Sequence, residues 1–311
     1  MTTLVEQGHR FGGAWTELKL DAVHYYLGFF TTVLRTMPFE LWYIDAFAGS
    51  GSRIEMRETG GLLDGTPIET SSEQMAGSVM RALSVDPPFG RHVFIEGNAS
   101  RFRELETLRS EYPAKRIECR HGDANTELRS ILSSPPWSGP VRERSKLRAV
   151  VFLDPYGMNV AWDTLRMLAA TRAIDVWYLF PLQAVTRQLS VDLNRVDAYK
   201  QDRLDDIFGT SDWRDELYDT RVVTDLFAET ISTATRNVTQ AQIEEYSRTR
   251  LRTLFRYVSE PLPLIADGRG RLFSLFCLSN SSSDRAIDLI EKGVRATLKK
   301  FGPASRHRSG R

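Results

Sequence analysis

Apolar residues recur along this chain in two periods, and the two periods alternate. From Trp15 to Met37 apolar side chains return every three or four residues, which predicts an amphipathic helix. The segment LWYIDAF at 41–47 is short, continuous and aromatic, which favours a buried strand. The alternation continues with strands expected at 92–96, 116–120, 148–154 and 175–180 and with helices expected at 100–112, 125–132 and 161–170. Continuous apolar strands separated by helices predict a parallel sheet that is covered on both faces.

Two stretches interrupt this alternation. Residues 54–72 contain three glycines and a proline without periodicity, so we expect a long loop after the first strand that acts as a lid over a neighbouring site. Residues 183–256 are mainly polar and helix-like, with no obvious strand, so we expect a helical subdomain inserted late in the fold.

Strand periodicity returns after residue 256. The segments 256–266 and 271–279 flank the turn-forming residues 267–270, which predicts an antiparallel hairpin, and a last helix is expected at 284–301. The expected fold class is therefore a single α/β domain over residues 1–311. Its Rossmann-like sheet would be mostly parallel, would end in the antiparallel hairpin and would carry the helical insertion.

Composition narrows the class of protein without indicating an activity. The 311 residues are 41% hydrophobic and 26% charged, as in ordinary globular proteins, and the net charge of +1 gives no overall field that would attract nucleic acid or anionic lipid. The two cysteines lie far apart and the five histidines lack the spacing of metal ligands, so we expect neither a disulfide framework nor a metal site. No apolar segment has the length of a membrane helix, and the N-terminus lacks the apolar core of a signal peptide. We therefore expect a cytoplasmic protein without membrane contact.

Residues directly after the predicted strands are the candidate binding residues, because ligands of open parallel sheets bind beyond the carboxyl ends of the strands. The first strand runs into Asp45-Ala-Phe47-Ala-Gly49-Ser-Gly51, whose small residues allow a tight turn and a close backbone approach to a ligand. An ordinary strand-to-helix turn would have a similar composition. Glu96 follows the second strand, where nucleoside-binding folds place an acid that accepts hydrogen bonds from the ribose hydroxyls. The same acid could instead cap the next helix.

The third and fourth strand ends also carry an acid each. Asp123 could accept a hydrogen bond from an adenine amine, or it could be the N-cap of the following helix. The fourth strand ends in Asp154-Pro155-Tyr156-Gly157, the most distinctive short sequence in the chain. The proline fixes the loop, and the tyrosine offers a flat surface on which a planar substrate could stack. A simple turn would tolerate the same four residues.

Together these segments resemble class I methyltransferases that use S-adenosylmethionine. The run from Phe47 through Gly49 to Gly51 is similar to the first motif of amino-methyltransferases, in which Phe replaces the first Gly of Gly-x-Gly-x-Gly. Asp154-Pro155-Tyr156-Gly157 resembles their Asp-Pro-Pro-Tyr motif with the aromatic residue one position earlier. It is closer to the Asp-Pro-Phe-Gly of tRNA guanine-N2 methyltransferases.

A larger part of the chain resembles the bacterial three-Cys-motif partner protein family. The resemblance extends from about Trp15 to the LFSLF segment and is carried, in order, by WTELKLDAVHYYLGFF, YIDAFAGSGSR, DGTP, FIEGN, HGDAN and FLDPYG. The name of that family implies a partner protein with three cysteines of the radical-enzyme type.

The methyltransferase resemblance implies S-adenosylmethionine as the cofactor and gives each strand end a role. The methionine end would be lined by Asp45, Phe47, Gly49 and Gly51, the ribose would be held by Glu96, and the adenine by Asp123.

The same resemblance places Asp154, Pro155 and Tyr156 at the methyl acceptor. It implies N-methylation of a nucleobase or a related planar amine, with a nucleic acid or nucleoside as substrate. Transfer from a sulfonium to an amine requires chiefly orientation of the reactants, so no covalent intermediate is expected. The resemblance to the partner family leaves a second hypothesis, a catalytically degenerate methyltransferase-like protein that binds a three-cysteine radical-type enzyme.

Other activities fit the sequence less well. A cytosine-C5 mechanism needs a cysteine nucleophile, and no cysteine follows the fourth strand. Nicotinamide binding would call for Gly-x-Gly-x-x-Gly, which is missing after the first strand. Arg248, Arg252 and Arg256 lie four residues apart and could grip a phosphate backbone, or they could form an ordinary solvated helix face. The basic tail at 306–311 leaves the same two interpretations open.

Overall fold

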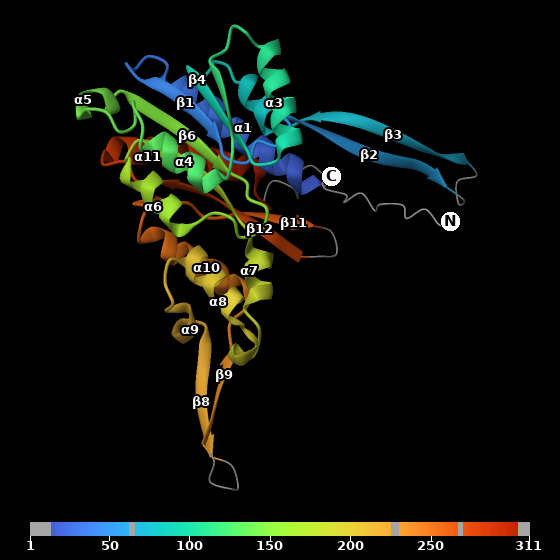
Figure 1. Cartoon of the computed structure of the whole chain (residues 1–311), viewed down its shortest axis with the longest axis vertical. Helices are drawn as coiled ribbons and strands as arrows, with labels where there is room; N and C mark the ends of the chain where they lie inside the picture. Colours follow the sequence, from blue (N-terminus) through green and yellow to red (C-terminus); the bar gives the residue numbers. More distant parts are fainter. Residues whose placement is uncertain (1–13, 62–65, 225–229, 267–269, 304–311) are drawn as a thin grey trace.

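The structure is a computed structural model that describes residues 14–61, 66–224, 230–266 and 270–303. For residues 14, 52–76, 143 and 221–233 it describes the backbone alone. Figure 1 shows a central sheet with helices on both faces, and two hairpins that project away from this body.

The central sheet has eight strands and the predicted mixed character. Its order is β10-β12-β7-β6-β1-β4-β5, with β11 also paired to β12. Five strands are parallel, namely β1 (Glu40–Asp45), β4 (Arg91–Glu96), β5 (Ile117–His121), β6 (Leu147–Leu153) and β7 (Ile174–Phe180). The antiparallel strands are β10 (Tyr257–Val258), β11 (Leu262–Ala266) and β12 (Gly270–Ser279). When the five parallel strands are numbered along the chain, their order across the sheet is 3-2-1-4-5, as in Rossmann-like folds. This order confirms the predicted fold class.

Two apolar layers sandwich this sheet because its strand side chains alternate in direction and both sets are buried. On β1, Trp42 and Ile44 belong to one core cluster, whereas Leu41 and Tyr43 belong to the other. The first cluster includes side chains of α4 (Ala124–Leu132), α6 (Trp162–Ala170) and α7 (Leu182–Gln188). The second includes side chains of α1 (Ala14–Leu34), α2 (Ser78–Leu83), α3 (Ala99–Glu111) and α11 (Asp284–Phe301). A short helix, α5 (Val141–Arg144), lies before β6.

The expected lid loop at 54–72 is instead part of an antiparallel hairpin, so the prediction of an unpaired loop was wrong. Its strands are β2 (Ser52–Gly61) and β3 (Thr66–Ala76), with Ser52 opposite Ala76. Two of the glycines that suggested a loop, Gly60 and Gly61, end β2, and the residues before them pair with β3 through their backbones. Residues 62–65 lie outside the described part of the chain. Figure 1 shows the hairpin extending away from the sheet. A lid function for it stays a prediction.

The insertion at 183–256 is helical in part, and the expectation of no strand was wrong. Its helices are α7 from its second residue onward, η1 (Leu193–Arg195), α8 (Ala198–Phe208), α9 (Trp213–Glu216) and α10 (Gln240–Arg252). Between α9 and α10 the strands β8 (Tyr218–Thr224) and β9 (Thr230–Arg236) form a second projecting hairpin. Both strands are dense in Val, Ile and Thr, whose branched side chains favour extended backbone over helix.

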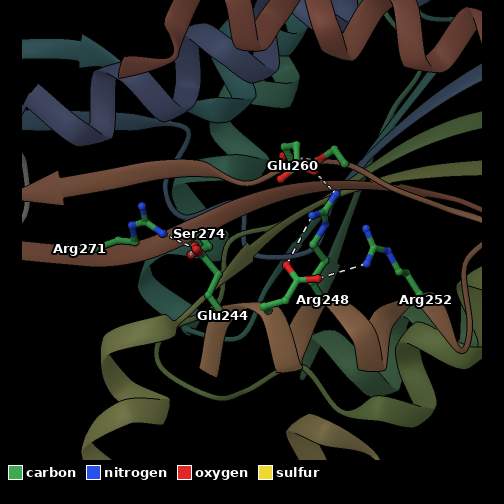
Figure 2. A network of polar contacts seen from close by, with 8 residues as sticks. Glu244, Arg248, Arg252, Glu260, Arg271 and Ser274 are labelled. Carbon is green, nitrogen blue, oxygen red and sulfur yellow. Dashed lines mark hydrogen bonds and ion pairs between the residues drawn. The ribbon is translucent and has the colours of Figure 1, made fainter. Parts of the chain in front are cut away.

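The arginines of α10 form ion pairs within the chain, and Figure 2 shows this network. Arg248 pairs with Glu260 and with Glu245 at 3.5 Å, and Arg252 pairs with Glu245 at 3.2 Å. Next to them the buried carboxylate of Glu244 accepts hydrogen bonds from Arg271 and Ser274 of β12. Arg256, beyond the helix, pairs with Asp284. The three arginines are thus engaged by acids of the chain itself, which favours a structural role over phosphate binding. The basic tail lies outside the described residues.

The two cysteines do not form a disulfide with each other. Cys277 is buried on β12 and Cys119 is half-buried on β5, and both are free thiols. Among the described helices, none combines the length and the apolar character that crossing a bilayer requires.

A buried histidine in the second core cluster makes stability depend on pH. His92 is 1% exposed and packs near the rings of Phe89 and Phe94. Burial, assisted by the charge of Lys115, lowers its pKa to about 4 from the ordinary 6.5. As the pH falls below 6.5, His92 binds a proton in the unfolded chain but stays neutral in the folded chain. The free energy of unfolding therefore decreases as the pH falls to about 4.

We expect His92→Phe to remove roughly 3 kcal/mol of this acid sensitivity, the free energy that corresponds to the shift in pKa. Urea unfolding of both proteins at several pH values between 7 and 4 would measure it. An identical loss of stability in the variant would mean that His92 is not the group responsible.

Candidate functional site

A crevice with two lobes runs along the carboxyl ends of the parallel strands. The first, which we call the Glu96 lobe, has a volume of about 380 Å³ and is lined by residues that follow β1, β4 and β5 and by two side chains of α8. The second, the Asp154 lobe, has a volume of about 460 Å³ and lies between the loop after β1, the loop after β6 and the start of α1. Phe47, Arg101 and Tyr156 line both lobes and form the border between them.

The structure brings the sequence-predicted site residues together along this crevice, with the exception of Asp45. The residues on its lining are Phe47, Gly49, Gly51, Glu96, Asp123, Asp154, Pro155 and Tyr156. They come from four different strand ends, and the parallel topology places those ends at one edge. Their roles toward a ligand stay predictions.

The loop after β1 has the backbone conformation that its glycines suggested. Gly49 and Gly51 have φ values of +66° and +83°, which residues with a side chain rarely adopt. A Cβ on Gly51 would come within 2.8 Å of Leu108 of α3, so the loop packs closely against that helix. A Cβ on Gly49 would point into open space, so the backbone there is accessible from the Asp154 lobe.

Asp45 lies beneath this loop and supports it. Its fully buried carboxylate accepts hydrogen bonds from the Phe47 backbone N–H at 3.1 Å, from the Tyr43 hydroxyl at 3.4 Å and from Ser78. Burial raises the pKa of Asp45 to about 6, although these hydrogen bonds favour its charged form. The carboxylate therefore holds the turn from below, and direct contact with a cofactor stays a prediction.

Glu96 presents a carboxylate to the first lobe while remaining mostly buried. It is 7% exposed, and its Oε1 accepts from the backbone N–H of Asn98 at 2.7 Å and lies 3.5 Å from Nε of Arg101. The alternative, that Glu96 caps the next helix, does not hold, because Asn98 is the N-cap of α3 and accepts from Ser100 and Arg101.

Asp123 does act as a helix cap. Its Oδ1 accepts from the backbone N–H of Thr126 at 3.0 Å and from the hydroxyl of the same residue at 3.1 Å, at the start of α4. Asp123 also lines the Glu96 lobe. Both interpretations of this acid therefore remain compatible with the structure.

Lys19 of α1 is a site residue that the sequence analysis missed. Its ammonium lies 2.5 Å from Asp154 Oδ2, and the residue is only 4% exposed. Trp15, one helical turn earlier, lies beside this ammonium and stacks on Phe273 of β12 with the ring centroids 5.1 Å apart. The signal was present, because Lys19 interrupts an apolar stripe that runs through Trp15 and Val23. A lysine on the buried face of a helix indicates a buried anionic partner.

Arg101 is a second missed residue, and it spans the border between the lobes. Its guanidinium lies near Glu96 on one side and 5.6 Å from the ring of Tyr156 on the other. Its Nη1 donates to the tyrosine hydroxyl at 3.4 Å. Tyr156 itself is 58% exposed, so much of this aromatic side chain faces the solvent.

Comparison with known proteins yields only remote structural similarity. No protein-family model matches the chain, and no curated protein matches it. Protein LPL1258 from Legionella pneumophila, assigned to family model DUF519, is 14% identical with a TM-score of 0.49, and 93% of each chain is covered. A candidate methyltransferase from Escherichia coli, yhhF, is 12% identical with a TM-score of 0.30, and 69% of this chain and 86% of that chain are covered. An S-adenosylmethionine-dependent methyltransferase from Clostridium acetobutylicum is 11% identical with a TM-score of 0.31, and 85% and 92% are covered.

At such identities and TM-scores these proteins carry no argument about activity. The strand order of the sheet itself, with its antiparallel addition at β12, decides the fold. The chain has a Rossmann-like α/β fold with antiparallel strands added at one edge of the parallel sheet. Membership of the three-Cys-motif partner family stays a prediction.

The buried pair of Lys19 and Asp154 makes a prediction about stability. We expect Lys19→Met to destabilise the protein by about 3 kcal/mol, near the lower end for a broken buried ion pair, because Asp154 keeps a quarter of its side chain exposed. Lys19→Met combined with Asp154→Asn removes the unpaired charge and should recover most of that loss. Denaturant unfolding of the single and double variants measures the coupling. Equal destabilisation by both would show that Asp154 does not depend on Lys19.

Proposed function

We propose that this protein is an S-adenosylmethionine-dependent methyltransferase that methylates a nitrogen of a nucleobase or a related planar amine. The observation that carries this proposal is the meeting of two lobes at Phe47, Arg101 and Tyr156. One lobe offers a carboxylate suited to ribose hydroxyls, and the other offers a carboxylate beside an exposed aromatic ring. A donor and an acceptor molecule bound in the two lobes would therefore touch at the shared border.

The residues of the Glu96 lobe and the glycine loop fit the cofactor. The exposed backbone at Gly49 allows a close approach, and Glu96 keeps acceptor positions beyond those taken by Asn98 and Arg101. When bound, the cofactor supplies a methyl group on a positively charged sulfur. Phe47 borders both lobes and Gly49 and Gly51 line the Asp154 lobe, so this loop would orient that end of the molecule toward the acceptor.

The residues of the Asp154 lobe fit a planar amine. Asp154 can accept a hydrogen bond from the amine N–H, which turns the nitrogen lone pair toward the shared border. Lys19 fixes this carboxylate on its Oδ2 side, and Pro155 restricts the loop that carries it. Tyr156, with the aromatic pair of Trp15 and Phe273 in the same lobe, offers flat surfaces for an aromatic ring. Aliphatic hydroxyls would make less use of these surfaces.

The alternative from the sequence, a degenerate protein that only positions a three-cysteine partner, predicts no turnover. Incubation of the purified chain with radiolabelled S-adenosylmethionine and total bacterial RNA or free nucleosides tests turnover directly. Incorporation of the methyl group supports the enzyme, whereas cofactor binding without incorporation into any of these acceptors favours the alternative.

We expect Glu96→Ala to weaken binding of S-adenosylhomocysteine by about 1.5 to 3 kcal/mol, the range for hydrogen bonds to a charged group. Gly49→Val should also weaken it, because a β-branched residue is strained at φ +66° and its side chain would occupy the backbone approach. Isothermal titration calorimetry measures both, with circular dichroism as the control for folding. Unchanged affinity in both folded variants would place the cofactor elsewhere.

Asp154 and Tyr156 are expected to serve the acceptor and not the cofactor. Asp154→Ala should abolish methyl transfer to the acceptor identified above while S-adenosylhomocysteine affinity stays within a few-fold. Tyr156→Phe keeps the ring and should be mild, whereas Tyr156→Ala should be severe. Single-turnover rates together with calorimetry separate these effects. Loss of cofactor binding in Asp154→Ala would contradict the assignment of this loop to the acceptor.

A further inference from the structure

The inserted helix α8 reaches the Glu96 lobe, although the insertion begins after the fifth parallel strand. Arg203 and Asp206 of α8 line this lobe together with Asp123, Asn125 and Glu96. The strand ends therefore form one side of the Glu96 lobe, and helix α8 of the insertion contributes another side.

Helix α8 is docked firmly enough to position a ligand contact. It ends at Phe208 and is capped by Gly209, whose φ of +66° and lack of a side chain allow it to lie directly against the indole of Trp162 at the start of α6. Arg250 of α10 donates to the carbonyl of Phe208 at 3.0 Å, so α10 also holds the C-terminal end of α8. Leu204, on the same helix, is completely buried. A side chain carried by this helix is thus held by packing on a rigid element.

The polar side chains that line the lobe beside α8 differ in how many hydrogen bonds they already make within the chain. Asn125 donates to the Asn159 carbonyl at 2.8 Å and accepts from Ala161 and Thr164, so its amide group is used in holding the loop after β6. The Oδ1 of Asp123 already accepts two hydrogen bonds from Thr126.

The carboxylate of Asp206 is less engaged. It accepts from the backbone N–H of Trp162, and Arg203 Nη1 lies 3.9 Å away, beyond hydrogen-bond distance. Arg203 instead binds the carbonyl of Met158 and the side chain of Asn159. Burial, with a smaller contribution from the charge of Asp163, raises the pKa of Asp206, so this carboxyl has lost part of its hydration. A carboxylate has about four acceptor positions, so Asp206 retains capacity for a ligand donor.

We propose that Asp206 accepts a hydrogen bond from the exocyclic amine of the adenine ring, and that the insertion thereby sets the purine specificity of the Glu96 lobe. This inference rests on the function proposed above, because it names the group that would recognise one end of the cofactor. An acceptor at this position distinguishes adenine, which presents an N–H there, from hypoxanthine, which presents a carbonyl oxygen.

The test uses the full-length protein and two probes, S-adenosylhomocysteine and S-inosylhomocysteine, in calorimetric titrations. The unmodified protein should bind the adenine compound at least about tenfold more tightly. Asp206→Asn keeps an oxygen for the Trp162 N–H but offers an N–H to the inosine carbonyl, so it should reduce this preference about tenfold. Asp202→Asn is the matched control, because Asp202 is an exposed residue of the same helix outside both lobes, and it should keep the full preference.

Three other results would overturn either the role of Asp206 or the proposed function. Equal binding of the two probes by the unmodified protein would overturn the inference without any variant, so a misfolded Asp206→Asn cannot shield it. A preference that survives in Asp206→Asn but is lost in Asp123→Asn would assign the amine to Asp123 and overturn the role of α8. Failure of the unmodified protein to bind S-adenosylhomocysteine at all would overturn the proposed function itself.

Discussion

Burial of both faces of the parallel sheet is the constraint on which the rest of this structure depends. The middle strands β6 and β7 are covered on both sides, so their backbone polar groups pair in the ladder and their side chains are mostly apolar. Acids concentrate at the strand ends, where Asp45 and Glu96 close β1 and β4 and Asp154 follows β6. Because the strands are parallel, these acids meet at one edge although they lie far apart in the chain.

Acids gathered at one edge repel each other, and the helices supply the charges that offset this repulsion. The charge of Asp154 contributes to the raised pKa of Asp45. Lys19 of α1 pairs with Asp154, and Arg101 of α3 lies against Glu96. Each cation comes from a helix of the second core layer and each acid from a strand end, so the packing of that layer determines the electrostatics of the crevice. In the Asp154 lobe the positive charge of Lys19 offsets the negative charge of Asp154. A neutral ligand would therefore suit this lobe better than an anionic one.

Local periodicity was sufficient to predict the body of the fold, because the middle strands β6 and β7 are buried on both faces and are nearly continuous apolar segments. The amphipathic pattern predicted the helix at 284–301, and two strand-like segments around turn-forming residues predicted the hairpin of β11 and β12. The two projecting hairpins were missed because β2 pairs with β3 alone and β8 with β9 alone, and a two-stranded ribbon needs no apolar core face. At the site, topology predicted which strand ends meet. It could not predict that Lys19 pairs with a carboxylate 135 residues away, because the approach of α1 to that edge is set by tertiary packing.

The insertion joins this arrangement at two separate places. Its α10 is bound to β12 through the buried Glu244, which accepts from Arg271 and Ser274 (Figure 2), and its α8 is held against α6 through Gly209 and Trp162. Two attachments prevent the insertion from moving as an independent unit, since motion at one would break packing or ion pairs at the other. The Glu96 lobe consequently has one wall from the sheet edge and another from the insertion. Proteins that share this sheet but carry different insertions would then differ in the ligands they select, which is why the fold by itself leaves specificity open.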